Sequence, residues 1–211
     1  MSNLNYGFGE DQTKKGGNPF PIACDVDNVE ITNCKYSSGT SQTGKEWEAI
    51  DVTYTRAGTN LSDKMFAVNP DNVQARRFIP GDTNETALED KVKTYNTQLK
   101  HIATKLGITD QELMKCRTTP FAALAEDYCN LINSHSNGQK LYLKTTLNGG
   151  YPKVCRNPNN NIPFLQNMND GPCELVYNPK ELEALEKEMA PKNGVMEGSG
   201  SPSSKWLSDS I

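Results

Sequence analysis

The sequence predicts a mainly β fold in which a helical insert separates the third strand from the fourth. Three observations predict it: three early segments alternate apolar and polar residues, apolar residues then recur every three or four positions, and the alternation returns after residue 139. We therefore divide the chain into a flexible arm at 1–19, a domain at 20–177 with the insert at 84–134, an amphipathic helix at 178–191 and a flexible tail at 192–211.

The first two strands contain the large aromatic ring whose position most needs explaining. Residues 22–36 are typical of a strand, and a change of parity near Asn28 predicts a β-bulge. Residues 45–58 are typical of a second strand, whose inward face is formed by Ile50, Val52 and Tyr54. Trp47 falls on the opposite parity. A large apolar ring on an outward face indicates either stacking of a ligand's rings or cover by the insert helices.

The third strand, at 63–68, places Lys64 and Phe66 on one parity. Val68 shares that parity, which favours a core position for Phe66. Phe66 is nevertheless kept as a candidate for stacking, because it follows a cation on the same side of the strand.

The middle of the chain has the period of a helix. Apolar residues recur at alternating steps of four and three from Leu88 to Leu106, and Gly107 follows as a stop signal. Thr109 and Glu112 have the spacing of a capping box, which predicts a short second helix. A third helix is expected after Thr119-Pro120, with its buried side formed by Phe121, Leu124, Tyr128 and Leu131.

Strands resume at Lys140, where leucines alternate with a stripe of Lys140, Tyr142 and Lys144. Such a stripe is either a solvated face or a platform for a polyanion that carries flat rings. Asn148-Gly149 predicts a tight hairpin turn, and residues 162–168 and 173–177 are typical of short extended pieces. Asn178-Pro179 then opens the last helix.

Charge is unevenly distributed along the chain. The formal net charge of -4 argues against a nucleic-acid partner, but no Asp or Glu occurs from Tyr128 through Asn169. Four cations lie inside that window: Lys140, Lys144, Lys153 and Arg156. Local charge decides binding more than the total does, so this window favours contact with phosphates.

The sequence favours neither a metal site nor an anchored protein. Six cysteines occur without a C-x-x-C pair, and only two histidines are present, which excludes a zinc finger or ribbon and favours buried, reduced thiols. The N-terminus lacks the apolar run of a signal peptide, and no stretch is apolar enough to span a bilayer. We expect a soluble protein with no cofactor and no membrane partner.

Catalytic motifs are missing as well. The chain has no phosphate-binding loop, no nucleophile elbow and no H-E-x-x-H helix, so we do not expect an enzyme. Four early acids could gather the metal ions of a nuclease, although alternating acids on a strand are more often solvated: Asp25, Asp27, Glu30 and Asp51.

The order of three strands, a helical insert and a returning hairpin is that of a five-stranded Greek-key barrel of the OB type, although a small α+β sheet could share it. The segments "VEITNCKYSSGTSQTGKEWEAIDVTYTRAG" and "LYLKTTLNGGYPKV", followed by a tail with a hydrophobic end, resemble the single-stranded-DNA-binding proteins of tailed bacteriophages. The resemblance implies a protein that coats single-stranded DNA without sequence preference. It also implies a role in phage replication and recombination in the cytoplasm of an infected bacterium.

Binding of this kind needs cations for phosphates and rings for bases. The candidate DNA-binding residues are Lys45, Trp47, Lys64, Phe66, Arg76, Arg77, Lys140, Tyr142, Lys144, Tyr151, Lys153 and Arg156. In the tail, Trp206, Leu207, Asp209 and Ile211 are candidates for contact with phage replication or recombination proteins. The alternatives are a structural or assembly protein of a virion and a metal-dependent nuclease.

Overall fold

The computed structural model describes residues 20–156 and 163–190. The predicted arm at 1–19 and the predicted tail at 192–211 lie outside the described residues, and so do the tail candidates Trp206, Leu207, Asp209 and Ile211.

The strands are β1 (Val26–Thr40), β2 (Glu46–Arg56), β3 (Thr59–Phe66), β4 (Leu141–Leu143), β5 (Thr145–Asn148), β6 (Tyr151–Val154) and β7 (Leu165–Asn167). The helices are α1 (Asn84–Lys105), α2 (Asp110–Leu113), α3 (Phe121–His135) and α4 (Pro179–Met189), with short 3-10 turns η1 (Pro70–Asn72) and η2 (Met168–Asp170). None of the helices in this described part of the chain is long and apolar enough to cross a bilayer.

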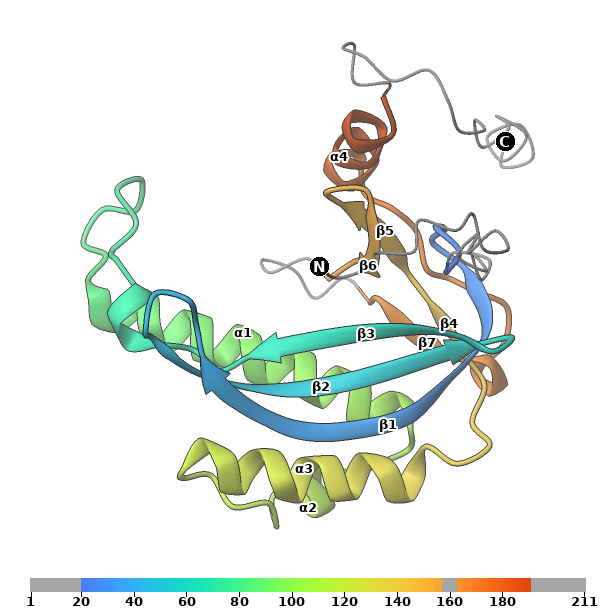
Figure 1. The fold of residues 1–211 in the computed structure, drawn as a ribbon, viewed down its shortest axis with the longest axis horizontal. Helices are drawn as coiled ribbons and strands as arrows, with labels where there is room; N and C mark the ends of the chain where they lie inside the picture. Colours follow the sequence, from blue (N-terminus) through green and yellow to red (C-terminus); the bar gives the residue numbers. More distant parts are fainter. Residues whose placement is uncertain (1–19, 157–162, 191–211) are drawn as a thin grey trace, which may run out of the picture.

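Five strands form one antiparallel sheet in the order β3-β2-β1-β4-β7, and β5 and β6 form a separate hairpin. Figure 1 shows β1, β2 and β3 as one curved layer, with α1 and α3 running alongside it. The mainly β architecture with helices between the third and fourth strands is confirmed. Among the described residues the hydrogen-bonded sheet does not close into a barrel.

The core lies between the long strands and the two long helices. Ile50, Val52 and Tyr54 of β2 are fully buried, as the alternation predicted, and they belong to one cluster with residues of α1 and α3. Tyr128 of α3 donates a hydrogen bond to the carbonyl oxygen of Leu99 in α1 at 2.8 Å, which ties the helices to each other. Burying each large side chain of this kind stabilises the fold by about 1.5–3 kcal/mol.

Local signals in the sequence set most element boundaries. Asn28 has a positive φ of 53°, and the pairing of β1 with β4 shifts register between Val26 and Val29, so the predicted bulge is confirmed. The capping box of Thr109 and Glu112 is also confirmed. The predicted turn after β5 is present, with Gly149 and Gly150 as its central residues, both at positive φ.

Of the two short extended pieces expected after the hairpin, the one at 162–168 contains β7, and residues 173–177 join no sheet. One expectation about the later strands is wrong. The strand after Lys140 is interrupted at Lys144, whose backbone N–H donates to Phe164 and whose carbonyl accepts from Cys155. The interruption breaks the alternation, because Lys144 and Thr145 are both fully buried.

Lys144 therefore does not line an outer surface with Lys140 and Tyr142. Its ammonium lies 3.0 and 3.1 Å from the two carboxylate oxygens of Glu181 and donates to the carbonyl oxygen of Val176. Glu181 also caps the N-terminus of α4, through a hydrogen bond from the backbone N–H of Asn178. This buried ion pair thus joins α4 to the segment between β4 and β5.

The six cysteines are free thiols, and three of them are buried: Cys34, Cys129 and Cys155. Cys34 and Cys129 join β1 to α3, with their sulfur atoms 3.2 Å apart. That hydrogen bond, together with burial, raises the pKa of Cys34 far above that of a free thiol. Both side chains act as small core hydrophobes, as the sequence predicted.

Replacing Lys144 with Ala should lower the free energy of unfolding by about 3 kcal/mol, because it leaves the Glu181 carboxylate buried without its cation. Urea denaturation followed by circular dichroism measures the change. The control is Lys187→Ala, which removes an exposed pair with Glu183 within the same helix and should have little effect. Equal losses in the two variants would contradict the buried pair.

His101 should make the fold acid-sensitive. Burial is the main cause that lowers its pKa to about 4, while the unfolded chain titrates at about 6.5. As the pH falls from 6.5 to 4 the unfolded chain takes up the proton first, so stability is lost across that window, by about 2 kcal/mol between pH 7 and pH 5. His101→Gln should flatten this loss in denaturation midpoints, whereas the partly exposed His135→Gln should keep it.

Candidate nucleic-acid interface

The face of β1–β3 that points away from α1 and α3 is the open face of the sheet. The register places Gly39 opposite Trp47, Ala49 opposite Phe66, and Asp51 between Lys35 and Lys64. Lys35 and Lys64 are exposed, and Phe66 keeps 54% of its surface exposed. The core position favoured for Phe66 is therefore wrong, because the buried parity of β3 is that of Leu61 and Met65, and Phe66 shares the outward parity of Lys64.

Trp47, Phe66 and Lys64 form a compact cluster on this open face. The two rings meet edge to face, with centroids 5.7 Å apart and planes at 79°. The ammonium of Lys64 lies 4.5 Å from the centre of the Trp47 ring, which is a cation–π contact. The expected outward position of Trp47 is confirmed, and its ring is half-buried against Phe66 rather than under the helices.

Gly39 leaves the space that the Trp47 ring occupies. A Cβ atom built on Gly39 would lie 2.8 Å from Cζ2 of the ring, closer than carbon atoms approach without a shift. The indole thus lies flat over the backbone of the neighbouring strand. Sequence alternation alone could not identify this pairing, because it depends on the register of β1 with β2.

The centre of the open face carries a carboxylate that is short of partners. Asp51 lies 3.7 Å from the ammonium of Lys64, and its other oxygen has no hydrogen-bond partner among the described residues. The hydroxyl of Ser37 on the adjacent strand likewise has no partner in the described part of the chain. A water molecule or a polar ligand group would satisfy both atoms.

The same end of the molecule carries two more predicted cations. The ammonium of Lys45 lies 3.5 Å from the side-chain oxygen of Asn72, so the β1–β2 turn contacts η1. The chain then leads into the loop that holds Arg76 and Arg77. Arg77 is exposed and has no ion pair among the described residues. Lys45, Trp47, Lys64, Phe66 and Arg77 therefore belong to one end of the sheet.

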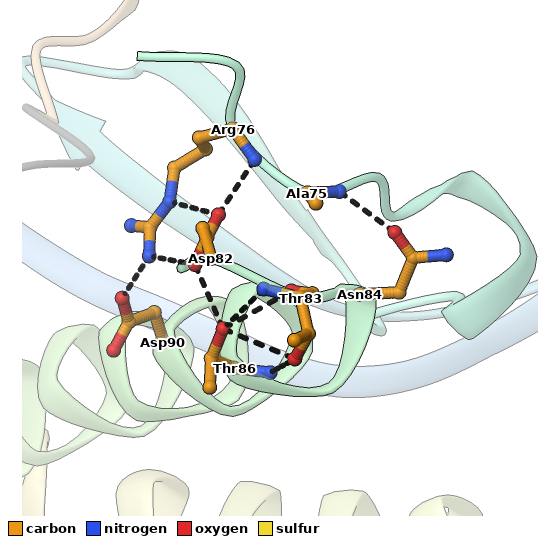
Figure 2. Close-up of polar contacts among 7 residues, drawn as sticks. All are labelled: Ala75, Arg76, Asp82, Thr83, Asn84, Thr86 and Asp90. Atoms are coloured by element: carbon orange, nitrogen blue, oxygen red, sulfur yellow. Dashed lines mark hydrogen bonds and ion pairs between the residues drawn. The ribbon is translucent and has the colours of Figure 1, made fainter. Parts of the chain in front are cut away.

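Arg76 stabilises the loop before α1 and is not free to bind a ligand. Figure 2 shows its guanidinium turned back toward α1, where it donates to both carboxylate oxygens of Asp82, at 2.9 Å each, and to Asp90 at 2.7 Å. These hydrogen bonds hold the pKa of Asp82 well below its usual range. With its charge matched by two acids, Arg76 is a poor phosphate ligand in this arrangement.

The remaining predicted residues lie on β4–β6, apart from this cluster. Tyr151 is 77% exposed and Lys153 is exposed on the same parity of β6. Tyr142 is half-buried, and Lys140 is paired with Glu30.

Arg156 points inward, contrary to its predicted place among the DNA ligands. Its guanidinium contacts Asp63 at 2.5 Å and Gln98 at 3.2 Å, and only 18% of its side chain is exposed. Burial raises the pKa of Asp63 even though Arg156 opposes the shift. Arg156 thereby joins the end of β6 to β3.

Three of the four acids weighed for a nuclease are engaged by cations, Asp51 by Lys64 as described above. Asp27 accepts two hydrogen bonds from Arg56, and Glu30 pairs with Lys140. Among the described residues there is no group of three or more His, Cys, Asp or Glu side chains positioned to share a metal ion.

One exposed ring was missed. Phe78 is 95% exposed on the loop that follows Arg77, next to the half-exposed Ile79. The signal was present, since two apolar residues inside the turn sequence "RRFIPGD" have no strand or helix to bury them.

No family model, no curated protein and no solved structure matches this chain. The assignment of function therefore rests on the residues described above.

Proposed function

We propose that this protein binds single-stranded DNA without sequence preference, and that the open face of β1–β3 is the binding surface. The cluster of Trp47, Phe66 and Lys64 is the observation that carries the proposal. Exposed rings stack on bases of any sequence, and a neighbouring cation pairs with the phosphate. Here the Trp47 ring contacts both the Phe66 ring and the ammonium of Lys64.

The charges on this surface, together with its rings, favour single-stranded over duplex DNA as the ligand. Lys35, Lys45 and Arg77 supply cations around the rings, while Asp51 offsets part of the charge of Lys64. With a net charge of -4 the whole protein repels a polyanion, so binding depends on stacking as well as on charge. Only unpaired bases are free to stack on protein rings.

The architecture is compatible with an open OB-type barrel. β6 contacts β3, and the ion pair of Arg156 with Asp63 joins the two strands where a closed barrel would have ladder hydrogen bonds. Such folds bind nucleic-acid strands on the face of their second and third strands, which here carries Trp47 and Lys64.

For the cellular role we rely on the resemblance of the sequence to phage single-stranded-DNA-binding proteins. In that role the chain would coat single strands in the cytoplasm of an infected bacterium during replication and recombination, without catalysing a reaction. On β6, the exposed Tyr151 and Lys153 would contact further nucleotides of a longer DNA strand. A structural or assembly protein of a virion would not need the ring and cation cluster to contact DNA.

Affinity for a labelled oligo(dT) should fall as salt rises, because each neutralised phosphate releases a counterion. Three or four contacts from the surface cations predict a slope of about -2 to -3 in a plot of log affinity against log salt. Fluorescence anisotropy measures the slope. The matched duplex should bind more weakly under every condition. At a salt concentration on the order of 10 mM, exposed charges are least screened. Absence of binding under that condition would favour the alternative of a virion assembly protein.

Trp47→Ala and Phe66→Ala should each weaken oligo(dT) binding by about 1–3 kcal/mol, since each removes a stacking ring. Met189→Ala is the matched control, because Met189 has the same exposed fraction as Phe66 but lies on α4. Thermal unfolding of each variant separates lost stacking from lost structure. Unchanged affinity with a lower melting temperature would mean that the rings are needed only for folding.

A further inference from the structure

In the second half of the loop between β3 and α1, hydrogen bonds join residues 75–76 to the start of α1. Arg76 is held by Asp82 and Asp90, and the backbone N–H of Ala75 donates to the side chain of Asn84 at 2.8 Å (Figure 2). Inside the loop, the N–H of Ile79 donates to the carbonyl of Arg76, and the N–H of Asp82 donates to that of Ile79. The tip therefore has a fixed conformation.

This fixed tip presents apolar side chains to solvent. Phe78 is 95% exposed and Ile79 is 46% exposed, with Arg77 beside them. Because the backbone of the loop is braced, burial of Phe78 by a partner costs little backbone conformational entropy. We call Arg77, Phe78 and Ile79 the loop tip.

An apolar groove of about 840 Å³ lies at the same end of the molecule. It runs between α1 and the α2–α3 connection, and its apolar lining includes Tyr95, Leu99, Leu113, Met114, Phe121 and Leu124. Met114 is 81% exposed at this groove. The charged residues in the lining are Glu48, Asp110 and Lys100, an excess of one acid.

We propose that two copies of this chain associate by placing the loop tip of each in the groove of the other. The groove is large enough for a phenylalanine with a neighbouring isoleucine, and Arg77 matches its excess acid. Phe78 does not fill the groove of its own chain, because it is almost fully exposed.

Placement of the two features favours a two-fold pair. Ala67 and Val68 line the groove, and the loop tip begins nine residues after Val68. A surface that carries both the tip and the groove is self-complementary, so one rotation makes the contact twice. Repeating a small contact in this way gives an association that a single phenylalanine could not support.

The test is sedimentation velocity of the full chain over a range of concentrations, after nuclease treatment and at high salt, so that no nucleic acid links the copies. Phe78→Ser should raise the dimer dissociation constant at least tenfold, as loss of a central aromatic anchor does. Met114→Lys should do the same by placing at the groove a positive charge that repels Arg77 of the incoming loop tip. Tyr151→Ser is the control, because it removes a similarly exposed ring on β6.

Mixing the two damaged proteins gives a sharper readout. A pair of one Phe78→Ser copy and one Met114→Lys copy retains one intact contact, so the mixture should dimerise more tightly than either variant alone. Circular dichroism confirms that each variant is folded.

Three results would overturn the proposal: a wild-type protein that stays monomeric at every concentration, equal dimerisation of wild type and Phe78→Ser, or no gain on mixing. If removal of residues 192–211 abolished association while Phe78→Ser left it unchanged, the groove would take the C-terminal segment instead, and the proposal would again be wrong. None of these results depends on DNA binding, so they leave the proposed function to its own test.

Discussion

The packing of α1 and α3 on one face of the three long strands is the interaction on which the rest of the structure depends. It buries Ile50, Val52 and Tyr54, and because strand side chains alternate, it also determines which residues face away from the helices. Trp47 and Phe66 are outward for this reason. A slip of one residue in the register would exchange the two sets, burying the rings and exposing the core, so the same energy that stabilises the sheet also orients the candidate surface.

Two ion pairs connect the later part of the chain to this layer. Lys144 with Glu181 attaches α4, and Arg156 with Asp63 attaches the end of β6 to β3. Both cations come from the acid-free window that the sequence marked as a phosphate-binding region. Their charges are matched within the fold, so neither cation is available to a ligand. In this protein a local excess of lysine and arginine serves the assembly of the structure.

The elements with clear periodicity could be predicted from the sequence, including the bulge at Asn28, the capping box of Thr109 and the outward position of Trp47. The buried place of Lys144 could not, because its partner lies 37 residues further along the chain and alternation carries no information about such distances. The exposure of Phe66 follows from the alternation in β3, where Leu61 and Met65 face the core, and the sequence alone does not show which parity of a strand is buried. The cluster was thus partly predictable, as a list of rings and cations without their geometry.

The contact of Trp47 with Gly39 has a consequence for how this protein can vary over time. A Cβ at position 39 would meet the indole, so a larger residue there requires either a shift of the ring or a smaller residue at position 47. The two positions, eight residues apart in the chain and opposite each other in the sheet, are thereby coupled. Among descendants of this sequence, a lineage that keeps the tryptophan at 47 should therefore also keep the glycine at 39.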